Sequence, residues 1–158
     1  MRSPFAIDEV YRPFNNDILM VTMLSDGSIK KRILASTAKS LFANPKREED
    51  WASLVRYFEN PELQMVTYTI TEKGYLLTDE AEDPELPTSA MGTTCALLLK
   101  RFEAGAHPIT MVTTDNFSQN GKKFRDSIIA VAKNWFDKGK VGQDFIDYVS
   151  DEKAVSFP

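Results

Sequence analysis

Two segments of the chain place hydrogen-bonding side chains directly after a β-branched run. The runs are residues 65–70 and residues 109–113. The side chains that follow them carry hydroxyl, carboxylate and amide groups: Thr71 and Glu72 after the first run, and Asp115 and Asn116 after the second. If the two runs form parallel strands, these groups meet at the carboxyl edge of one sheet. Open α/β folds bind their ligands at that edge.

Each of these side chains has a possible chemical role and a simpler alternative. The Glu72 carboxylate could accept hydrogen bonds from a ligand hydroxyl or relay a proton. The Asn116 amide could donate a hydrogen bond to an oxygen that gains negative charge. Alternatively, Thr71, Asp115 and Asn116 belong to ordinary turns and bond nearby backbone, while Glu72 is solvated. A third interpretation pairs Glu72 with Asp115 as the two carboxylates of a hydrolase.

The composition indicates a soluble globular protein with the length of one domain. The chain has 158 residues, of which 42% are hydrophobic and 27% are charged. Nineteen basic and twenty-three acidic residues give a net charge of -4, which does not favour nucleic-acid binding. The sequence contains no apolar run of the length that spans a membrane and no signal-peptide pattern at its start. We therefore expect neither a nucleic-acid partner nor a membrane.

The cysteine and histidine content argues against a disulfide and a metal site. Cys95 is the only cysteine and His107 the only histidine. A single cysteine excludes an internal disulfide and fits the reducing cytoplasm. One cysteine and one histidine are too few for a nitrogen and sulfur metal site. We expect Cys95 to pack as a small hydrophobe and His107 to lie in a surface loop.

Periodicity predicts a hairpin followed by alternating helices and strands. Residues 17–24 and 29–34 read as two strands joined by a tight turn at Ser-Asp-Gly-Ser. From residue 48 the apolar spacing changes to that of a helix, which the Asn-Pro pair at 60–61 ends. After it we expect a strand at 63–70 that is covered on both faces, and then an acidic loop at 79–87. A helix capped by Thr88 or Ser89 and a strand at 109–113 follow. The last expected elements are helices at 120–138 and 141–149. Ser118 and Asn120 are expected to cap the first of those last two helices. This alternation predicts a parallel sheet with right-handed crossovers.

The seven glycines do not form a phosphate-binding turn. They stand at positions 27, 74, 92, 105, 121, 139 and 142, so no Gly-x-Gly-x-x-Gly segment occurs. A Gly-Lys-Ser or Gly-Lys-Thr loop is absent as well. Taken alone, the sequence cannot form a complete dinucleotide site of the usual kind.

Three segments together resemble the mannitol dehydrogenase family of polyol-specific long-chain dehydrogenases, which includes fructuronate and tagaturonate reductases. Residues 69–75, Thr-Ile-Thr-Glu-Lys-Gly-Tyr, are similar to the family's Thr-x-Thr-Glu-x-Gly-Tyr segment. Residues 109–116 end in Asp-Asn, with Asn-Gly at 120–121, as in the family's corresponding strand. Residues 155–158 resemble the approach to the family's Asn-x-Met-Val-Asp-Arg-Ile motif. The resemblance implies an α/β fold: a partial Rossmann-like domain with parallel strands, flanking helices and an N-terminal β-hairpin.

The resemblance implies roles for five residues of this chain. Asn116 would be catalytic, stabilising the alkoxide-like oxygen as a secondary alcohol is oxidised. Thr71 and Glu72 would lie beside the nicotinamide of NAD or NADP, with Glu72 on the proton path. Asp115 and Asn120 would brace the junction. The family uses no metal in catalysis, and the residue that selects NAD or NADP is not matched in this sequence.

The resemblance also indicates that residues 1–158 are a single incomplete nucleotide-binding domain. The family's Gly-rich first βαβ unit and its helical C-terminal domain, with the lysine, asparagine and histidine of the acid-base chemistry, are not matched. We therefore expect a fragment of a cytoplasmic NAD(P)-dependent oxidoreductase acting on a polyol or hexuronate, inactive as isolated and able to self-associate through surface exposed by truncation. The alternative is a non-enzymatic α/β binding or interaction module that uses the same sheet edge.

Overall fold

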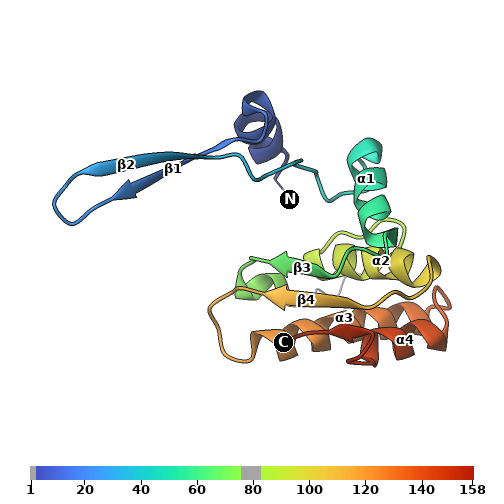
Figure 1. Ribbon diagram of the computed structural model, residues 1–158. Coiled ribbons are helices and arrows are strands. Elements are labelled where there is room, and N and C mark those ends of the chain that lie inside the picture. The colour runs from blue at the N-terminus through green and yellow to red at the C-terminus, as the bar shows by residue number, and fades with distance from the viewer. Residues whose placement is uncertain (1–2, 76–82) are drawn as a thin grey trace. The chain divides into compact units, whose positions relative to one another are not determined.

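The computed structural model describes residues 3–75 and 83–158, and Figure 1 shows the elements that they form. The chain divides into two compact units, Met1–Ala43 and Asn44–Pro158. The acidic loop expected at residues 79–87 lies partly outside the described residues.

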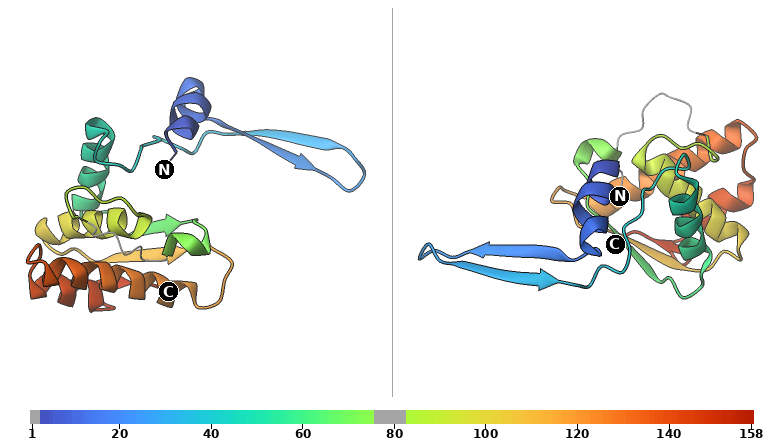
Figure 2. Two further views of the ribbon diagram at one scale, coloured as in Figure 1. Left: turned by 180° about the vertical axis from the view of Figure 1, so that it is seen from behind. Right: turned by 90° about the horizontal axis from the view of Figure 1, so that it is seen from above.

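The first unit contains two short helical segments and the expected hairpin. The segments η1 (Ala6–Tyr11) and η2 (Arg12–Phe14) precede the antiparallel strands β1 (Ile18–Met23) and β2 (Ile29–Leu34), which form a long two-stranded ribbon (Figure 2). The turn between the strands closes where Asp26 Oδ1 accepts a 2.9 Å hydrogen bond from the Ser28 N–H. Gly27 adopts a φ of 83°, which glycine reaches without the steric cost that a side chain would add. The hairpin prediction is confirmed.

The second unit is a parallel sheet with helices, as the alternation predicted. Its strands lie in the order β3-β4-β5, and both pairings are parallel. The strands are β3 (Met65–Tyr68), β4 (Ile109–Thr113) and β5 (Val155–Ser156), and the short helical turn η3 (Glu72–Tyr75) follows β3. The helices are α1 (Glu48–Glu59), α2 (Ala90–Glu103), α3 (Asn120–Asp137) and α4 (Gln143–Ser150). Strand β5 was not predicted, because two residues are too few to show a period.

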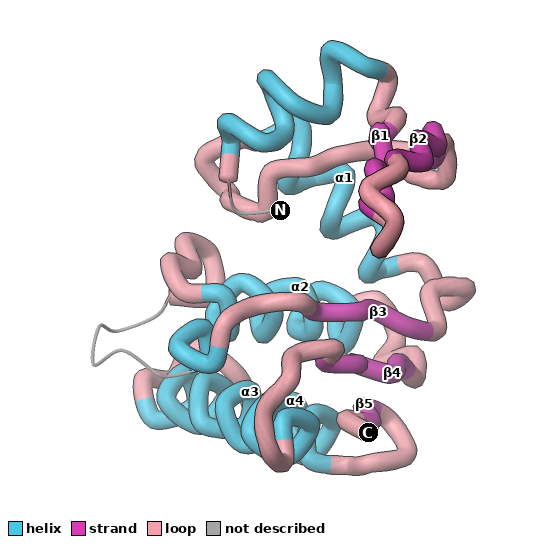
Figure 3. Tube along the Cα trace, turned by 90° about the vertical axis from the view of Figure 1, so that its left-hand side faces the viewer, coloured by secondary structure: helices cyan, strands magenta, loops and turns pink. Residues whose placement is uncertain are grey.

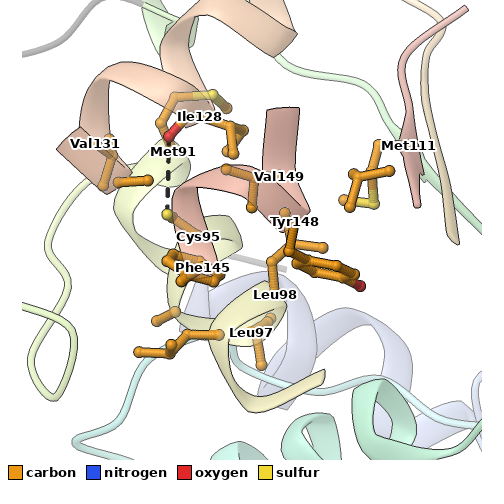
Figure 4. Packing of buried hydrophobic residues seen from close by; sticks show 14 of the residues in the cluster. Met91, Cys95, Leu97, Leu98, Met111, Ile128, Val131, Phe145, Tyr148 and Val149 are labelled. Atoms are coloured by element: carbon orange, nitrogen blue, oxygen red, sulfur yellow. Dashed lines mark hydrogen bonds between the residues drawn. The ribbon is translucent and has the colours of Figure 1, made fainter. Parts of the chain in front are cut away.

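The core lies between the sheet and the apolar faces of α2, α3 and α4 (Figure 4). Ser89 caps α2 by accepting a 2.9 Å hydrogen bond from the Gly92 N–H, which confirms one of the two expected caps. Cys95 is fully buried, and its thiol points toward the Ile128 carbonyl of α3 at 3.9 Å. One apolar face of α3, the helix predicted at 120–138, is buried along its length: Phe124, Ile128, Val131, Ala132 and Trp135.

Strand β3 is shorter and more exposed than predicted. The helices α2, α3 and α4 lie on one face of the sheet (Figure 3). On β4, Ile109, Met111 and Thr113 are buried against them, whereas the alternate residues are only partly buried. Met65 of β3 is 57% exposed, because β3 lies at the edge of the sheet within the described residues. The expectation that both faces of residues 63–70 are covered is therefore wrong.

A single buried arginine fixes the amino ends of β3 and β4. The side chain of Arg101, on α2, is fully buried and donates to five backbone carbonyls. One carbonyl lies in the last turn of α1 and two lie between α1 and β3: Phe58, and Asn60 and Leu63. The other two, of His107 and Pro108, directly precede β4. Burial lowers the pKa of the guanidinium, which nevertheless stays charged at neutral pH.

We predict that Arg101→Met lowers the free energy of unfolding by at least about 3 kcal/mol, because five backbone carbonyls lose the buried guanidinium that donates to them. Urea unfolding measures the change. Lys100→Met is the matched control, since Lys100 lies next to Arg101 on α2 but makes only surface ion pairs with Glu85 and Glu103. Its expected effect is below about 1 kcal/mol. Equal losses in the two variants would contradict the role assigned to Arg101.

Candidate functional site

The carboxyl ends of β3 and β4 lie level with each other. The parallel register pairs Met65 with Thr110 and Tyr68 with Thr113, and both strands run in the same direction in Figure 1. Just beyond the strands, the hydroxyl oxygens of Thr69 and Thr114 are 2.7 Å apart. The two junctions identified in the sequence therefore meet at one edge of the sheet, as parallel pairing required.

The Asp115 carboxylate connects the two junctions directly. Its Oδ2 accepts a 3.0 Å hydrogen bond from the Ile70 N–H and a 2.5 Å hydrogen bond from the Tyr75 hydroxyl. The Thr113 hydroxyl donates to the same oxygen at 3.2 Å. Asp115 is partly buried, and these bonds direct its carboxylate into the protein. The contacts are those of a group that holds the two strand ends together.

Tyr75 is a member of this network that the sequence analysis did not single out. Its side chain is buried, and its ring packs edge-on against Phe117 and Phe124. Its hydroxyl lies 2.6 Å from the Thr113 hydroxyl as well as bonding Asp115. Burial, together with the Asp115 carboxylate, raises the pKa of Tyr75 to about 12. The available signal was its place at the end of the Thr-Glu-Lys-Gly-Tyr segment, but a tyrosine in a turn does not reveal its partner.

Three of the expected site residues are exposed at the same edge. Thr71, Glu72 and Asn116 all have solvent-accessible side chains. Glu72 Oε1 accepts a 2.7 Å hydrogen bond from Lys123 Nζ of α3, and the same ammonium lies 4.9 Å from the centre of the Phe117 ring. Because both ion-pair partners are substantially exposed, solvent screens the attraction between them. The edge therefore presents a hydroxyl, a carboxylate and an amide to solvent.

Asn120 contacts the second junction and does not cap its helix. Its Nδ2 donates a 2.7 Å hydrogen bond to the Asp115 carbonyl, and its Oδ1 accepts one from the Gly121 N–H. The residue at the cap position of α3 is Gln119, which has a φ of 55° and makes no side-chain capping bond. The expectation that Asn120 or Ser118 caps α3 is wrong, because the Asn120 side chain bonds the turn before the helix.

Gly121 allows the backbone of residues 157 and 158 to pass close to the start of α3. A Cβ on Gly121 would lie 2.8 Å from the Phe157 carbonyl oxygen and still closer to that of Pro158. The Asn-Gly pair at 120–121 thus has two separate tasks. The asparagine holds the Asp115 carbonyl, and the glycine makes room for the chain that leaves β5.

Across residues 3–75 and 83–158, no group of three or more histidine, cysteine, aspartate or glutamate side chains is placed to hold a metal ion. None of the helices in the described part of the chain is long and apolar enough to cross a membrane.

The sequence model described as the mannitol dehydrogenase Rossmann domain matches residues 15–158. The chain belongs to the mannitol dehydrogenase family. Among relatives in this family, it is 42% identical to D-mannonate oxidoreductase of Thermotoga maritima over 97% of its own length. It is 29% identical to mannitol 2-dehydrogenase of Cereibacter sphaeroides over 54% of its length. The chain spans 30% of the first relative and 21% of the second.

Solved structures show the same fold. The chain superposes on Pseudomonas fluorescens mannitol 2-dehydrogenase, solved as a ternary complex with NAD and D-mannitol, with a TM-score of 0.74. The sequence identity is 24%, and the match covers 99% of this chain and 32% of that one. A D-sorbitol dehydrogenase in substrate-free form gives a TM-score of 0.72 at 19% identity over 94% of this chain. The Rossmann-like fold and the family resemblance predicted from the sequence are confirmed.

We predict that Gly121→Ala lowers the free energy of unfolding by about 1–3 kcal/mol. The new methyl group would have to displace the backbone of Phe157 and Pro158, which is harder to move than the end of a side chain. Chemical unfolding measures the loss. Gly74→Ala is the control, since its nearest neighbour is the flexible end of the Ile70 side chain at 3.0 Å. A smaller loss in Gly121→Ala than in Gly74→Ala would contradict the assignment.

We predict that the protein loses stability in alkali above pH about 10. The pKa of Tyr68 is raised to about 12 by burial, as is that of Tyr75 by burial and Asp115, against an ordinary value of 10.0. Because these folded values exceed the unfolded one, the unfolded chain releases the protons first. The stability is therefore complete below about pH 10 and falls as the pH rises toward about 12, by at most about 1.4 kcal/mol per unit for each tyrosine.

Urea unfolding at about pH 9 and about pH 11 checks this dependence. A double variant, Tyr68→Phe with Tyr75→Phe, should lose less stability over this interval than the wild type does. An equal loss in the two proteins would show that neither phenol is held protonated by the fold.

Proposed function

We propose that this chain is part of the nucleotide-binding domain of an NAD(P)-dependent oxidoreductase that interconverts a sugar-derived secondary alcohol and its ketone. The observation that carries the proposal is the union of the two junctions at one sheet edge, where Asp115 joins them and Glu72 and Asn116 face solvent. Relatives named for mannonate oxidation and mannitol oxidation support the reaction class.

The residues at this edge fit one half of a nicotinamide dinucleotide. The Thr71 hydroxyl and the Glu72 carboxylate can bond the polar groups of a nicotinamide riboside, and both are exposed beside β3. The pyrophosphate half needs backbone N–H groups from a Gly-rich turn. The sequence has no such turn. We therefore assign Thr71 and Glu72 to the nicotinamide end of NAD or NADP, and the phosphate contacts to polypeptide outside this chain.

Asn116 is the residue that we assign to the reacting oxygen. An amide donor just beyond the end of a strand can stabilise the negative charge that develops on the oxygen as the alcohol loses its proton, before the hydride leaves. The bound cofactor would supply the hydride acceptor. Glu72 can accept or relay the proton, since its carboxylate is exposed and is bonded by the exposed ammonium of Lys123. Asp115 and Asn120 support the junction through the bonds described above.

The substrate class follows from the relatives rather than from this chain's own side chains. We propose a polyol or a hexuronate-derived alcohol, in line with the names mannonate oxidoreductase and mannitol 2-dehydrogenase. Residues 1–158 are in this proposal one incomplete nucleotide-binding domain, without the Gly-rich first βαβ unit and the helical C-terminal domain. The general base would then come from polypeptide outside this chain.

The surroundings of the chain are also proposals. Among the described residues β3 is an edge strand, and its Met65 is 57% exposed, so the isolated chain should self-associate at high concentration. A cytoplasmic location fits a sequence whose one cysteine, Cys95, is buried and has no second cysteine with which to form an internal disulfide.

The proposal predicts activity in the full-length protein that contains this chain and none in the 158-residue chain alone. With NADH and fructose, fructuronate or tagaturonate, the full-length protein should oxidise the cofactor, as its absorbance reports. In that protein Asn116→Ala should lower kcat by about 100-fold, the effect of losing an oxyanion donor. Asn134→Ala is the control, because Asn134 lies on the exposed side of α3 and accepts a bond only from Lys138. Turnover by the isolated chain, or an unchanged kcat in Asn116→Ala, would refute the proposal.

A further inference from the structure

Residues 70–75 form a loop whose two ends bond the same carboxylate oxygen. The Ile70 N–H and the Tyr75 hydroxyl both donate to Asp115 Oδ2, at 3.0 and 2.5 Å. Between these ends lie Thr71 and Glu72, the residues that we assign to the nicotinamide. The Asp115 carboxylate, just after β4, therefore holds both ends of the loop that carries Thr71 and Glu72.

We propose that Tyr75 is a positioning residue, which fixes the loop of Thr71 and Glu72 against the end of β4 through the Asp115 carboxylate. The inference rests on the proposed function for what the loop does, and on the structure alone for how it is held.

The backbone of Tyr75 is anchored as well as its side chain. Its carbonyl accepts a 2.7 Å hydrogen bond from the Ser127 hydroxyl of α3. Within the loop, the Gly74 N–H donates to the Thr71 carbonyl at 2.7 Å, so the chain turns back within four residues. Tyr75 thus joins the loop to β4 through its hydroxyl and to α3 through its carbonyl.

The alternative anchor of the loop is the pair between Glu72 and Lys123, and it is the weaker one. Both of its side chains are about half exposed, at 61% and 47%, so water screens their attraction. The Tyr75 hydroxyl and the Asp115 carboxylate instead meet beside a buried ring, where a charge-assisted hydrogen bond is stronger. We therefore expect the loop to respond to loss of the Tyr75 hydroxyl more than to loss of the Lys123 ammonium.

Tyr68 supplies a matched control. Its ring also packs edge-on against Phe124, at 4.9 Å between centroids compared with 5.6 Å for Tyr75. Its hydroxyl accepts a 2.9 Å hydrogen bond from the Thr94 hydroxyl of α2, whereas the Tyr75 hydroxyl bonds Asp115. Tyr68→Phe and Tyr75→Phe each remove one hydroxyl beside the same Phe124 ring. Only Tyr75→Phe removes a hydrogen bond to Asp115 that holds the loop.

Amide hydrogen exchange in the 158-residue chain tests the closure. Tyr75→Phe should raise the exchange rates of the Ile70 and Gly74 amides by about tenfold, the factor expected from losing one buried hydrogen bond. Tyr68→Phe and Lys123→Met should leave these rates within about twofold of the wild type. If Tyr75→Phe does not fold, Thr113→Val replaces it, because this change removes the hydroxyl that contacts both the Tyr75 hydroxyl and the Asp115 carboxylate. Unchanged rates in the folded variant would overturn the proposal.

Steady-state kinetics of the full-length protein test whether the hold of Tyr75 on the loop positions Glu72 for the reaction. Tyr75→Phe should lower kcat about tenfold while KM for the sugar stays within about twofold, because misplacing Glu72 impairs the reaction and not substrate capture. Tyr68→Phe should change neither value. A full-length wild type without oxidoreductase activity would remove the proposed function, and the exchange rates would still decide whether Tyr75 holds the loop. Active wild type with an unchanged kcat in Tyr75→Phe would overturn the positioning role.

Discussion

The Asp115 carboxylate accepts hydrogen bonds from both junctions of the sheet edge, and the arrangement of the candidate site depends on it. Apart from Asp115, the segment after β3 is joined to the segment after β4 by the exposed threonine pair of Thr69 and Thr114 and by the contact between the Tyr75 and Thr113 hydroxyls. A carboxylate that takes three donors at a partly buried position is costly to leave unpaired, so the donors and the acceptor hold one another in place. Asp115 therefore fixes the positions of the two segments that carry Glu72 and Asn116, while the side chains of both residues are exposed to solvent.

The opposite ends of the same strands are fixed by Arg101. A guanidinium has five N–H donors and no acceptor, so five carbonyls from two chain segments can satisfy it without a carboxylate. With the amino ends of β3 and β4 tied to α2 and their carboxyl ends tied by Asp115, the parallel register between them has little freedom to slip. Stability and function thus both require the fixed register of β3 and β4, since the strands that contribute to the core also set the spacing of the site.

Much of the fold could be predicted because it follows from local periodicity. The apolar stripe from Phe124 to Trp135 has the period of a helix, and the β-branched run at 109–113 has no other plausible structure. Prediction failed where the outcome depends on contacts distant in sequence. Asn120 reads as a cap, yet its amide bonds the Asp115 carbonyl, and Tyr75 reads as a turn residue, yet its hydroxyl closes the loop. The exposure of β3 and the two-residue β5 likewise depend on which strands become neighbours, which a single sequence does not record.

The most direct test of the account is the spatial relation between the two junctions, measured by nuclear Overhauser effects in the 158-residue chain. Parallel strands tied by Asp115 require contacts between the side chains of Thr69 and Thr114, whose hydroxyl oxygens lie 2.7 Å apart, and between the Tyr75 ring and Thr113. These are the results that we predict. Contacts from Thr69 to Ile109 at the other end of β4, with none to Thr114, would place Glu72 and Asn116 at opposite ends of the sheet and contradict the account.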